Sequence, residues 1–179
     1  MRRLRERHDD AFLAQLYATP HDHTRWADHI ERVRATIEFA NELCLPVGRV
    51  ADLSCGDGTI ARALSDDPIL GDFAPGYEIH GPIEETIWTI DPVDLFICCE
   101  TIEHLDTPFA VLTLIRTKAQ RLLLSCPLIA PDQTDDNVEH YWAFSAEEMH
   151  QLLTECGWAP QWSRLIPGPY YTYQVWGAT

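Results

Sequence analysis

The sequence predicts a doubly wound α/β domain, in which helices cover both faces of a mostly parallel sheet. Short apolar runs alternate with segments of helical spacing along residues 48–179, which is typical of parallel strands joined by helical crossovers. The first five apolar runs are continuous, as expected of strands that are buried on both faces. The last two are joined by the turn IPGPY at residues 166–170, which predicts an antiparallel hairpin at the edge of the sheet.

Seven strands and four helices follow from these patterns. The expected strands are residues 49–54, 69–73, 78–83, 95–99, 121–125, 161–166 and 171–177. The expected helices are residues 24–43, 58–65, 108–118 and 145–156. The first helix is predicted from the spacing of the apolar residues Trp26, Ile30, Val33 and Ile37.

The organisation of the chain is simple. Only the three residues APG lie between Phe73 and Tyr77, so we expect no helix between the second and third strands. A length of 179 residues suits one compact unit. Within it, we expect residues 1–47 to form an N-terminal helical cap and residues 48–179 to form the main domain.

The net charge of −15 is carried by one part of the chain. Residues 1–49 hold eight arginines and eight acidic residues, whereas residues 50–179 hold five basic and twenty acidic residues. Such a surface repels phosphate backbones, which disfavours nucleic acid as a substrate.

Targeting and cysteine patterns suggest a cytoplasmic protein. No apolar run approaches the roughly 20 residues that span a bilayer, and the charged N-terminus lacks the apolar stretch of a signal peptide. The cysteines form no CxxC pair, which favours reduced, buried thiols over disulfides or a zinc site. They are Cys44, Cys55, Cys98, Cys99, Cys126 and Cys156.

The segment VADLSCGDGT at residues 50–59 is the sharpest local motif. A buried strand runs into a turn whose glycines allow a ligand to approach the backbone closely, at the strand end where open α/β sheets bind ligands. The segment lacks the GxGxxG spacing of dinucleotide sites and the lysine of a phosphate loop, and Asp52 and Asp57 would repel a pyrophosphate. The pattern therefore favours a cationic ligand without phosphate.

With its acidic residue and glycine turn, DLSCGDG resembles the first motif of class I S-adenosylmethionine-dependent methyltransferases, although Ser54 stands where that family usually has a glycine. Three later segments are also similar to the family: Asp72 at the end of the second strand, GPIEE after the third, and DLFICCETIEHL at the fourth. The resemblance covers residues 48–177 and implies a Rossmann-like seven-stranded sheet that binds S-adenosylmethionine. It also implies that the cofactor contacts are Asp52, Ser54, Gly56, Gly58, Asp72, Ile83 and Glu84.

Four potential metal ligands follow the fourth and fifth strands. In a helical turn, Glu100, Glu103 and His104 would share one face, and His140 lies in the later segment HYWAFSAEEM. Loops at these positions meet at the same edge of a parallel sheet, and mixed oxygen and nitrogen ligands suit Mg, Mn, Fe or Zn. The pattern resembles the metal segments of small-RNA 3′-terminal 2′-O-methyltransferases and of ubiquinone-pathway O-methyltransferases. That resemblance implies methyl transfer to a hydroxyl held by the metal.

Three interpretations of these four residues remain open. They bind a divalent metal, or Glu100 or His104 acts as a catalytic general base without one, or their role is structural. We expect O-methylation of a small-molecule acceptor. The alternatives are 2′-O-methylation of an RNA or nucleotide end and a non-catalytic module that binds the cofactor. The acidic loop and the missing third glycine disfavour a nicotinamide oxidoreductase.

The polar and aromatic segment before the first long helix has two interpretations. Extensions of this kind fold over cofactor and substrate, where His21 and His23 would touch the substrate. Alternatively, the segment is a surface loop in which Asp22 or Thr24 caps the helix.

Overall fold

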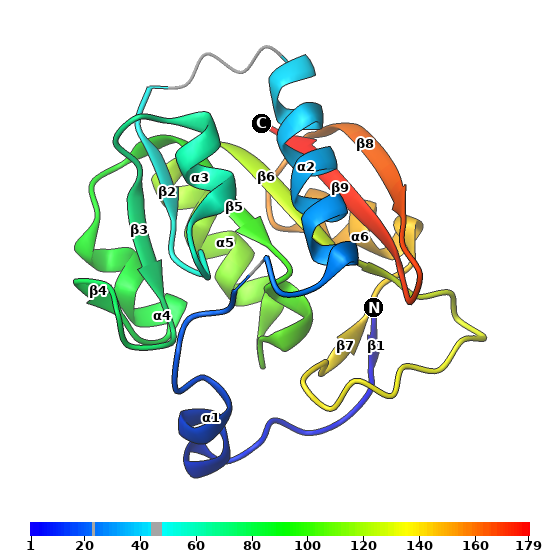
Figure 1. The fold of residues 1–179 in the computed structure, drawn as a ribbon. Helices are drawn as coiled ribbons and strands as arrows, with labels where there is room; N and C mark the ends of the chain where they lie inside the picture. The colour runs from blue at the N-terminus through cyan, green and yellow to red at the C-terminus, as the bar shows by residue number, and fades with distance from the viewer. Residues whose placement is uncertain (23, 44–47) are drawn as a thin grey trace.

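The computed structural model describes residues 1–22, 24–43 and 48–179, so His23 and Cys44 lie outside the described residues. Seven strands form one sheet in the order β4-β3-β2-β5-β6-β9-β8, and β1 and β7 form a second, two-stranded sheet (Figure 1). The strands are β1 (Arg2–Arg3), β2 (Val50–Asp52), β3 (Ile69–Asp72), β4 (Ile79–His80), β5 (Val93–Cys99), β6 (Ala119–Leu128), β7 (Trp142–Ala143), β8 (Pro160–Pro167) and β9 (Thr172–Ala178). The helices are α1 (Asp10–Leu16), α2 (Ala27–Glu42), α3 (Thr59–Leu64), α4 (Ile83–Thr86), α5 (Pro108–Lys118) and α6 (Ala146–Glu155), with the 3₁₀ helices η1 (Ile87–Thr89) and η2 (Ile102–His104).

The large sheet is mostly parallel. β2 pairs in parallel with β3 and β5, β3 with β4, and β5 with β6, whereas β9 pairs antiparallel with β6 and β8. The predicted seven-stranded sheet with an antiparallel C-terminal hairpin is therefore confirmed. The direction of winding reverses between β2 and β5. Open α/β sheets bind ligands in the crevice at such a switch point, beyond the carboxyl ends of the strands.

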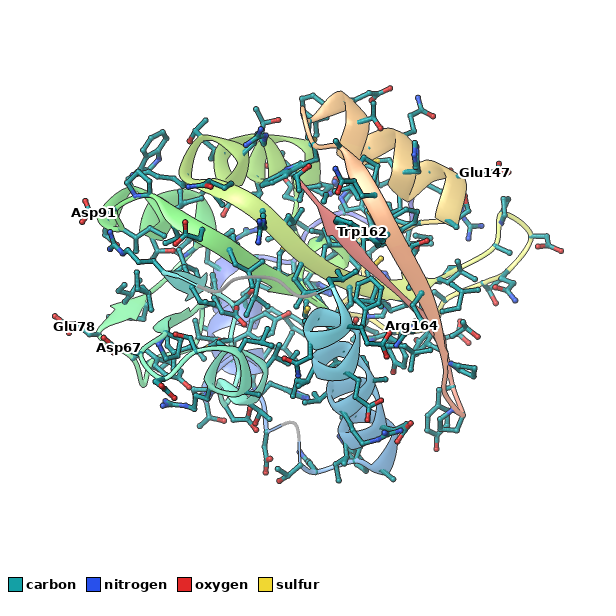
Figure 2. All side chains as sticks on the ribbon, turned by 90° about the horizontal axis from the view of Figure 1, so that it is seen from above. Asp67, Glu78, Asp91, Glu147, Trp162 and Arg164 are labelled. Atoms are coloured by element: carbon teal, nitrogen blue, oxygen red, sulfur yellow. The ribbon has the colours of Figure 1, made fainter. Side chains whose placement is uncertain are left out.

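Helices cover both faces of this sheet (Figure 2). β5 supplies alternate residues to two separate core clusters: Leu95 and Ile97 belong to the cluster beneath α2 and α3, while Phe96 and Cys98 belong to the cluster beneath α4, α5 and α6. Successive side chains of a strand point to opposite faces of its sheet. A strand covered on both faces must therefore be apolar throughout, which is the continuous pattern seen in the sequence.

The third strand is shorter than its pattern predicts. A strand is expected over residues 78–83, whereas β4 contains only Ile79 and His80, and α4 begins at Ile83. Gly81 has a φ of 122° and Pro82 is the N-cap of α4. Because proline has no backbone N–H to donate to a neighbouring strand, pairing ends before it. The fully described residues 73–78 contain no helix, as predicted.

The first long helix begins later than predicted. Its N-cap is Trp26, whereas Asp22 accepts a hydrogen bond from the Thr24 amide at 2.8 Å in a separate turn. The prediction that Asp22 or Thr24 caps the helix is therefore wrong. Trp26 and Ile30, both expected on the apolar face, are 49% and 51% exposed. The guanidinium of Arg25 lies 4.9 Å from the centroid of the Trp26 ring.

Two further observations concern the cysteines and the length of the helices. The cysteines of the described residues are free and buried, as predicted: Cys55, Cys98, Cys99, Cys126 and Cys156. Among the helices in the described ranges, none has the length and apolar character needed to cross a membrane.

Candidate active site

The loop after β2 turns sharply at two glycines. Gly56 and Gly58 have φ values of 57° and 77°, in the left-handed region that favours glycine. A Cβ at Gly58 would also lie 3.1 Å from Cδ1 of Leu70, so both conformation and space favour glycine there. The backbone N–H of Cys55 donates to the carbonyl of Gly71 at 3.0 Å, which ties the loop to β3.

Asp72, at the end of β3, holds this loop from the side. Its Oδ2 accepts a hydrogen bond from the amide of Gly56 at 2.8 Å, and its Oδ1 accepts one from the amide of Ala74 at 2.9 Å. The side chain is half-buried, and burial raises its pKa. Each carboxylate oxygen can accept more than one hydrogen bond. The glycine turn and Asp72 are thus in direct contact at one edge of the sheet, with acceptor capacity left for a ligand hydroxyl.

Asp52 and Ser54 connect this loop to the loop after β5. Oδ1 of Asp52 accepts a hydrogen bond from the amide of Ser54 at 3.1 Å, and burial raises the pKa of Asp52 to about 7. The hydroxyl of Thr101 donates to Oγ of Ser54 at 2.8 Å. Because Thr101 lies between β5 and η2, the loops after β2 and β5 meet at the switch point.

The two residues expected near the adenine lie in different environments. Ile83 is buried in the core cluster beneath α4, α5 and α6. Glu84 is half-buried in the first turn of α4. Of the two, Glu84 has the polar, partly accessible side chain that can reach a ligand.

Glu103, His104 and His140 form a cluster of potential metal ligands. One ligand atom from each lies within 4.8 Å of the others, and Nε2 of His104 is 3.7 Å from Oε1 of Glu103. Glu103 is 1% exposed, and neither of its carboxylate oxygens has a hydrogen-bond partner among the described residues. Burial and the nearby negative charge of Glu100 raise the pKa of Glu103 well above its usual value. A buried carboxylate without a partner is costly, and a bound cation removes that cost.

The hydrogen bonds of the two imidazoles leave their Nε2 atoms as ligand atoms. Nδ1 of His104 lies 3.0 Å from the carbonyl oxygen of Glu139, and Nδ1 of His140 lies 2.6 Å from Oδ2 of Asp135. A carbonyl oxygen and a carboxylate only accept, so both Nδ1 atoms carry the proton in the neutral rings. Nε2 of His140 accepts a hydrogen bond from the side-chain amide of Asn137 at 3.1 Å, so it becomes a ligand atom only when this amide turns away. Burial, assisted by His140, lowers the pKa of His104 to about 3.

Glu100 lies outside this three-residue cluster. Its φ of 52° is rare for a residue other than glycine. Its Oε1 accepts a hydrogen bond from the hydroxyl of Ser125 at 2.7 Å and lies 3.9 Å from a guanidinium nitrogen of Arg32. Of the four residues predicted to share a metal, the structure therefore brings three together and directs Glu100 toward a buried arginine.

The segment between α1 and α2 crosses the loop after β3 (Figure 1). The rings of Tyr17 and Phe73 are in edge contact, with centroids 5.5 Å apart, and a Cβ at Gly76 would lie 3.2 Å from Cγ of Pro20. Burial raises the pKa of Asp72, and the nearby charge of His21 opposes this rise. Residues 17–21 thus pack against the loop that follows β3, near Asp72.

Sequence reasoning missed several supporting residues. Ser125 is fully buried at the carboxyl end of a predicted strand. A polar residue in such an apolar run indicates a specific hydrogen-bonding role, so this position could have been found from the sequence. Asp135, which binds the His140 ring, lies in a polar loop without periodicity, and no pattern distinguishes it from its neighbour Asp136.

Comparisons with known proteins place this geometry in context. Neither a protein-family model nor a curated protein matches the chain, but solved structures do. A 1,6-didemethyltoxoflavin-N1-methyltransferase from Burkholderia thailandensis, with bound S-adenosylhomocysteine, is 18% identical with a TM-score of 0.67, over 87% of this chain and 79% of that one. The magnesium protoporphyrin IX methyltransferase of Synechocystis PCC 6803, with bound S-adenosylmethionine, is 14% identical with a TM-score of 0.61, over 95% and 91% of the two chains.

A third match extends over almost all of both chains. An S-adenosylmethionine-dependent methyltransferase from Clostridium acetobutylicum is 12% identical with a TM-score of 0.60, over 94% of this chain and 97% of that one. At such identities the likeness concerns the fold, and the strand order of the sheet agrees with it. The chain therefore has the class I fold of the S-adenosylmethionine-dependent methyltransferases.

Proposed function

We propose that this chain is an S-adenosylmethionine-dependent methyltransferase that methylates a hydroxyl of a small molecule with the help of a divalent metal. The observation that carries the proposal is the position of Glu103. Its buried carboxylate has no hydrogen-bond partner among the described residues, and one of its oxygens lies within 4.8 Å of a ring nitrogen of each of His104 and His140. Through Thr101 and Ser54, the same loop is hydrogen-bonded to the glycine turn that contacts Asp72.

The cofactor is assigned to the glycine turn and Asp72. The carboxylate of Asp72 would accept the ribose hydroxyls, and Glu84 would lie toward the adenine. The acidic residues of this edge favour a sulfonium cation over a phosphate-bearing cofactor. Transfer of a methyl group from a sulfonium depends mainly on alignment of the two reactants, so the role of these residues is to bind and orient.

Glu103, His104 and His140 would hold the metal through one carboxylate oxygen and two Nε2 atoms. A divalent ion there lowers the pKa of a bound hydroxyl and orients it toward the methyl donor. The two rings are oriented before any metal binds, because Nδ1 of His104 is hydrogen-bonded to Glu139 and Nδ1 of His140 to Asp135. Since burial lowers the pKa of His104 to about 3, protons do not compete for this ring at neutral pH.

A small acceptor is favoured by the charge of the chain and by its matches. The structures similar in fold include enzymes named for toxoflavin-type and porphyrin substrates. The excess of acidic residues opposes a polyanionic acceptor. Methylation of a 2′-hydroxyl at an RNA or nucleotide end is the alternative, and nucleosides and RNA belong in the acceptor panel.

Cofactor binding is tested by calorimetry with S-adenosylhomocysteine. We expect Asp72→Ala to weaken binding by about tenfold to a hundredfold, because hydrogen bonds to a charged group are lost. The exposed Asp67→Ala is the matched control and should bind as the wild type does. Absence of binding to the wild-type protein would overturn the proposal. Binding without turnover on any acceptor would favour a non-catalytic module.

The metal is tested by Mn²⁺ titration followed by electron paramagnetic resonance, together with transfer of a labelled methyl group to a panel of hydroxylated compounds. We expect His140→Ala to lose both Mn²⁺ binding and turnover while S-adenosylhomocysteine affinity is retained. His150→Ala, an exposed position on α6, serves as the control. Full turnover in excess chelator would contradict metal assistance and leave His104 or Glu100 as a general base.

A further inference from the structure

Asp135 is the centre of a hydrogen-bond network behind His140. It is 8% exposed, and its Oδ2 lies 2.6 Å from Nδ1 of His140. Its Oδ1 accepts hydrogen bonds from the hydroxyl of Tyr171 at 2.8 Å and from the amide of Asn137 at 2.9 Å. Although burial alone would raise the pKa of Asp135, the hydrogen bond from His140 and those from Asn137 and Tyr171 lower it. An ionised carboxylate in this position requires the proton on Nδ1 of the imidazole.

The loop that carries Asp135 and His140 is held in place by the N-terminal arm, which we define as residues 1–8. Arg5 donates to the carbonyl of Asp135 at 3.1 Å, and Arg2 donates to the carbonyls of Pro131 and Gln133 at 3.2 and 2.6 Å. β1 of the arm also pairs antiparallel with β7, which begins two residues after His140. Segments far apart in the sequence thus fix the position of this loop.

We infer that Asp135 is a positioning residue that sets the tautomer and ring orientation of His140, so that Nε2 is presented to the metal together with Glu103 and His104. The imidazole proton can reside on either nitrogen, and a ring with its proton on Nε2 cannot act as a ligand through that atom. Residues that bind the second nitrogen of a metal-ligating histidine typically change metal affinity by about tenfold to a hundredfold. The inference rests on the proposed metal function for its consequence, but the tautomer is observable without any metal.

The first measurement is nitrogen-15 NMR of histidine-labelled, metal-free protein. The His140 ring is assigned by the signal that is absent in His140→Ala. We expect the proton on Nδ1 in the wild type and in Asp135→Asn, whose side-chain oxygen still accepts. We expect a smaller Nδ1 population in Asp135→Ala, in which only the side-chain amide of Asn137, donating to Nε2 at 3.1 Å, still favours that tautomer. The control is Asp136→Ala, an exposed acidic neighbour in the same loop.

The second measurement is Mn²⁺ affinity by electron paramagnetic resonance. We expect Asp135→Ala to weaken it by at least about tenfold, Asp135→Asn and Tyr171→Phe to weaken it less, and Asp136→Ala to leave it unchanged. S-adenosylhomocysteine affinity, unchanged in all four variants, confirms that the fold is intact. If Asp135→Ala fails to fold, the Mn²⁺ affinities of Asp135→Asn and Tyr171→Phe decide the question, and values equal to that of the wild type overturn the positioning role.

The outcomes separate this inference from the proposed function. An Nδ1 tautomer or an Mn²⁺ affinity that is the same in the wild type and in Asp135→Ala overturns the positioning role. A wild-type protein that binds no Mn²⁺ overturns both metal assistance and the metal-presenting role of Asp135, whereas the NMR result still decides whether Asp135 sets the tautomer.

Discussion

Asp52 and Glu103 are buried carboxyl groups at neighbouring strand ends, and their different surroundings suit them to different roles. Asp52 accepts a hydrogen bond from the amide of Ser54, whereas Glu103 has no such partner among the described residues. Burial raises the pKa of both groups. Asp52 is therefore suited to hold the turn, with a carboxyl group that is only partly ionised near neutral pH, whereas the surroundings of Glu103 fit the proposed metal site.

The raised pKa of Asp52 predicts a pH-dependent stability. Its value is about 7 in the folded protein and near 3.8 in the unfolded chain. Below both values the carboxyl group is protonated in both states. As the pH rises from about 3.8 to about 7, the carboxyl group ionises in the unfolded chain but stays protonated in the folded protein, so stability is lost over this interval and levels off above it. We expect wild type to lose roughly 3 kcal/mol relative to Asp52→Asn between about pH 5 and pH 8.

This difference is measured by urea unfolding of both proteins without cofactor. The exposed Asp67→Asn carries the same charge change and should follow the wild type. Parallel pH profiles for wild type and Asp52→Asn would contradict the raised pKa.

Among the elements, α6 is defined by local sequence. Its N-cap Ser145 accepts a hydrogen bond from the amide of Glu148 at 3.2 Å, and the Glu148 carboxylate accepts one from the amide of Ser145 at 2.9 Å. This reciprocal capping box specifies a helix start within four residues of sequence. The expected helix, residues 145–156, accordingly differs from α6 by one residue at each end. By contrast, β1 exists only through its pairing with β7, 139 residues further on.

The capping box predicts the cost of removing its hydroxyl. Ser145→Ala leaves an amide of the first turn without its acceptor and should lower the free energy of unfolding by about 1 kcal/mol. The change in the free energy of unfolding is obtained from the shift in the midpoint of urea unfolding, with the slope of free energy against urea concentration the same in both proteins. Ser163→Ala, at an exposed position on β8, should change stability by less than about 0.5 kcal/mol. Equal effects of the two substitutions would show that the cap contributes nothing.

At the scale of the whole molecule, negative charge lies around the periphery of the sheet. Asp67, Glu78 and Asp91 are exposed at one end of the molecule and Glu147 at the other, and all four point outward (Figure 2). The chain as a whole carries a net charge of −15. A polyanion approaching such a surface is repelled, and the repulsion grows as salt is removed.

This charge distribution predicts weak binding of RNA. We expect fluorescence anisotropy with a short single-stranded RNA to detect no complex at about 0.1 M salt, and no gain at lower salt. A neutral nucleoside tested as a methyl acceptor is the control for recognition of the sugar alone. Tight binding of the RNA end, either seen only with Mn²⁺ or strengthened by it, would contradict the small-molecule assignment and favour 2′-O-methylation of RNA.

The carboxyl-end loops show how far the sequence alone predicts the site. Asp72 is assigned by its place after a strand and by family resemblance, and the structure puts it in contact with the predicted glycine turn. The sequence pattern groups Glu100 with Glu103, His104 and His140, and the structure brings the last three together. The helical spacing assumed for this segment does not hold at Glu100. Glu100 has a positive φ and η2 begins only at Ile102, so Glu100 points elsewhere.

The sequence by itself determined the layers of the fold. Strands that are buried on two faces, and helices with one buried face, each produce a characteristic local pattern of apolar residues. It also determined the start of α6, through the capping box of Ser145 and Glu148, and the position of the glycine turn. Only the tertiary structure decided three features: the partners of His140, the route of the N-terminal arm, and the burial of the Glu103 carboxylate without a hydrogen-bond partner among the described residues. The arm contacts residues more than a hundred positions away. The partners of His140 lie only three and five positions away, but in a loop without periodicity, so no local pattern of apolar residues marks either kind of contact.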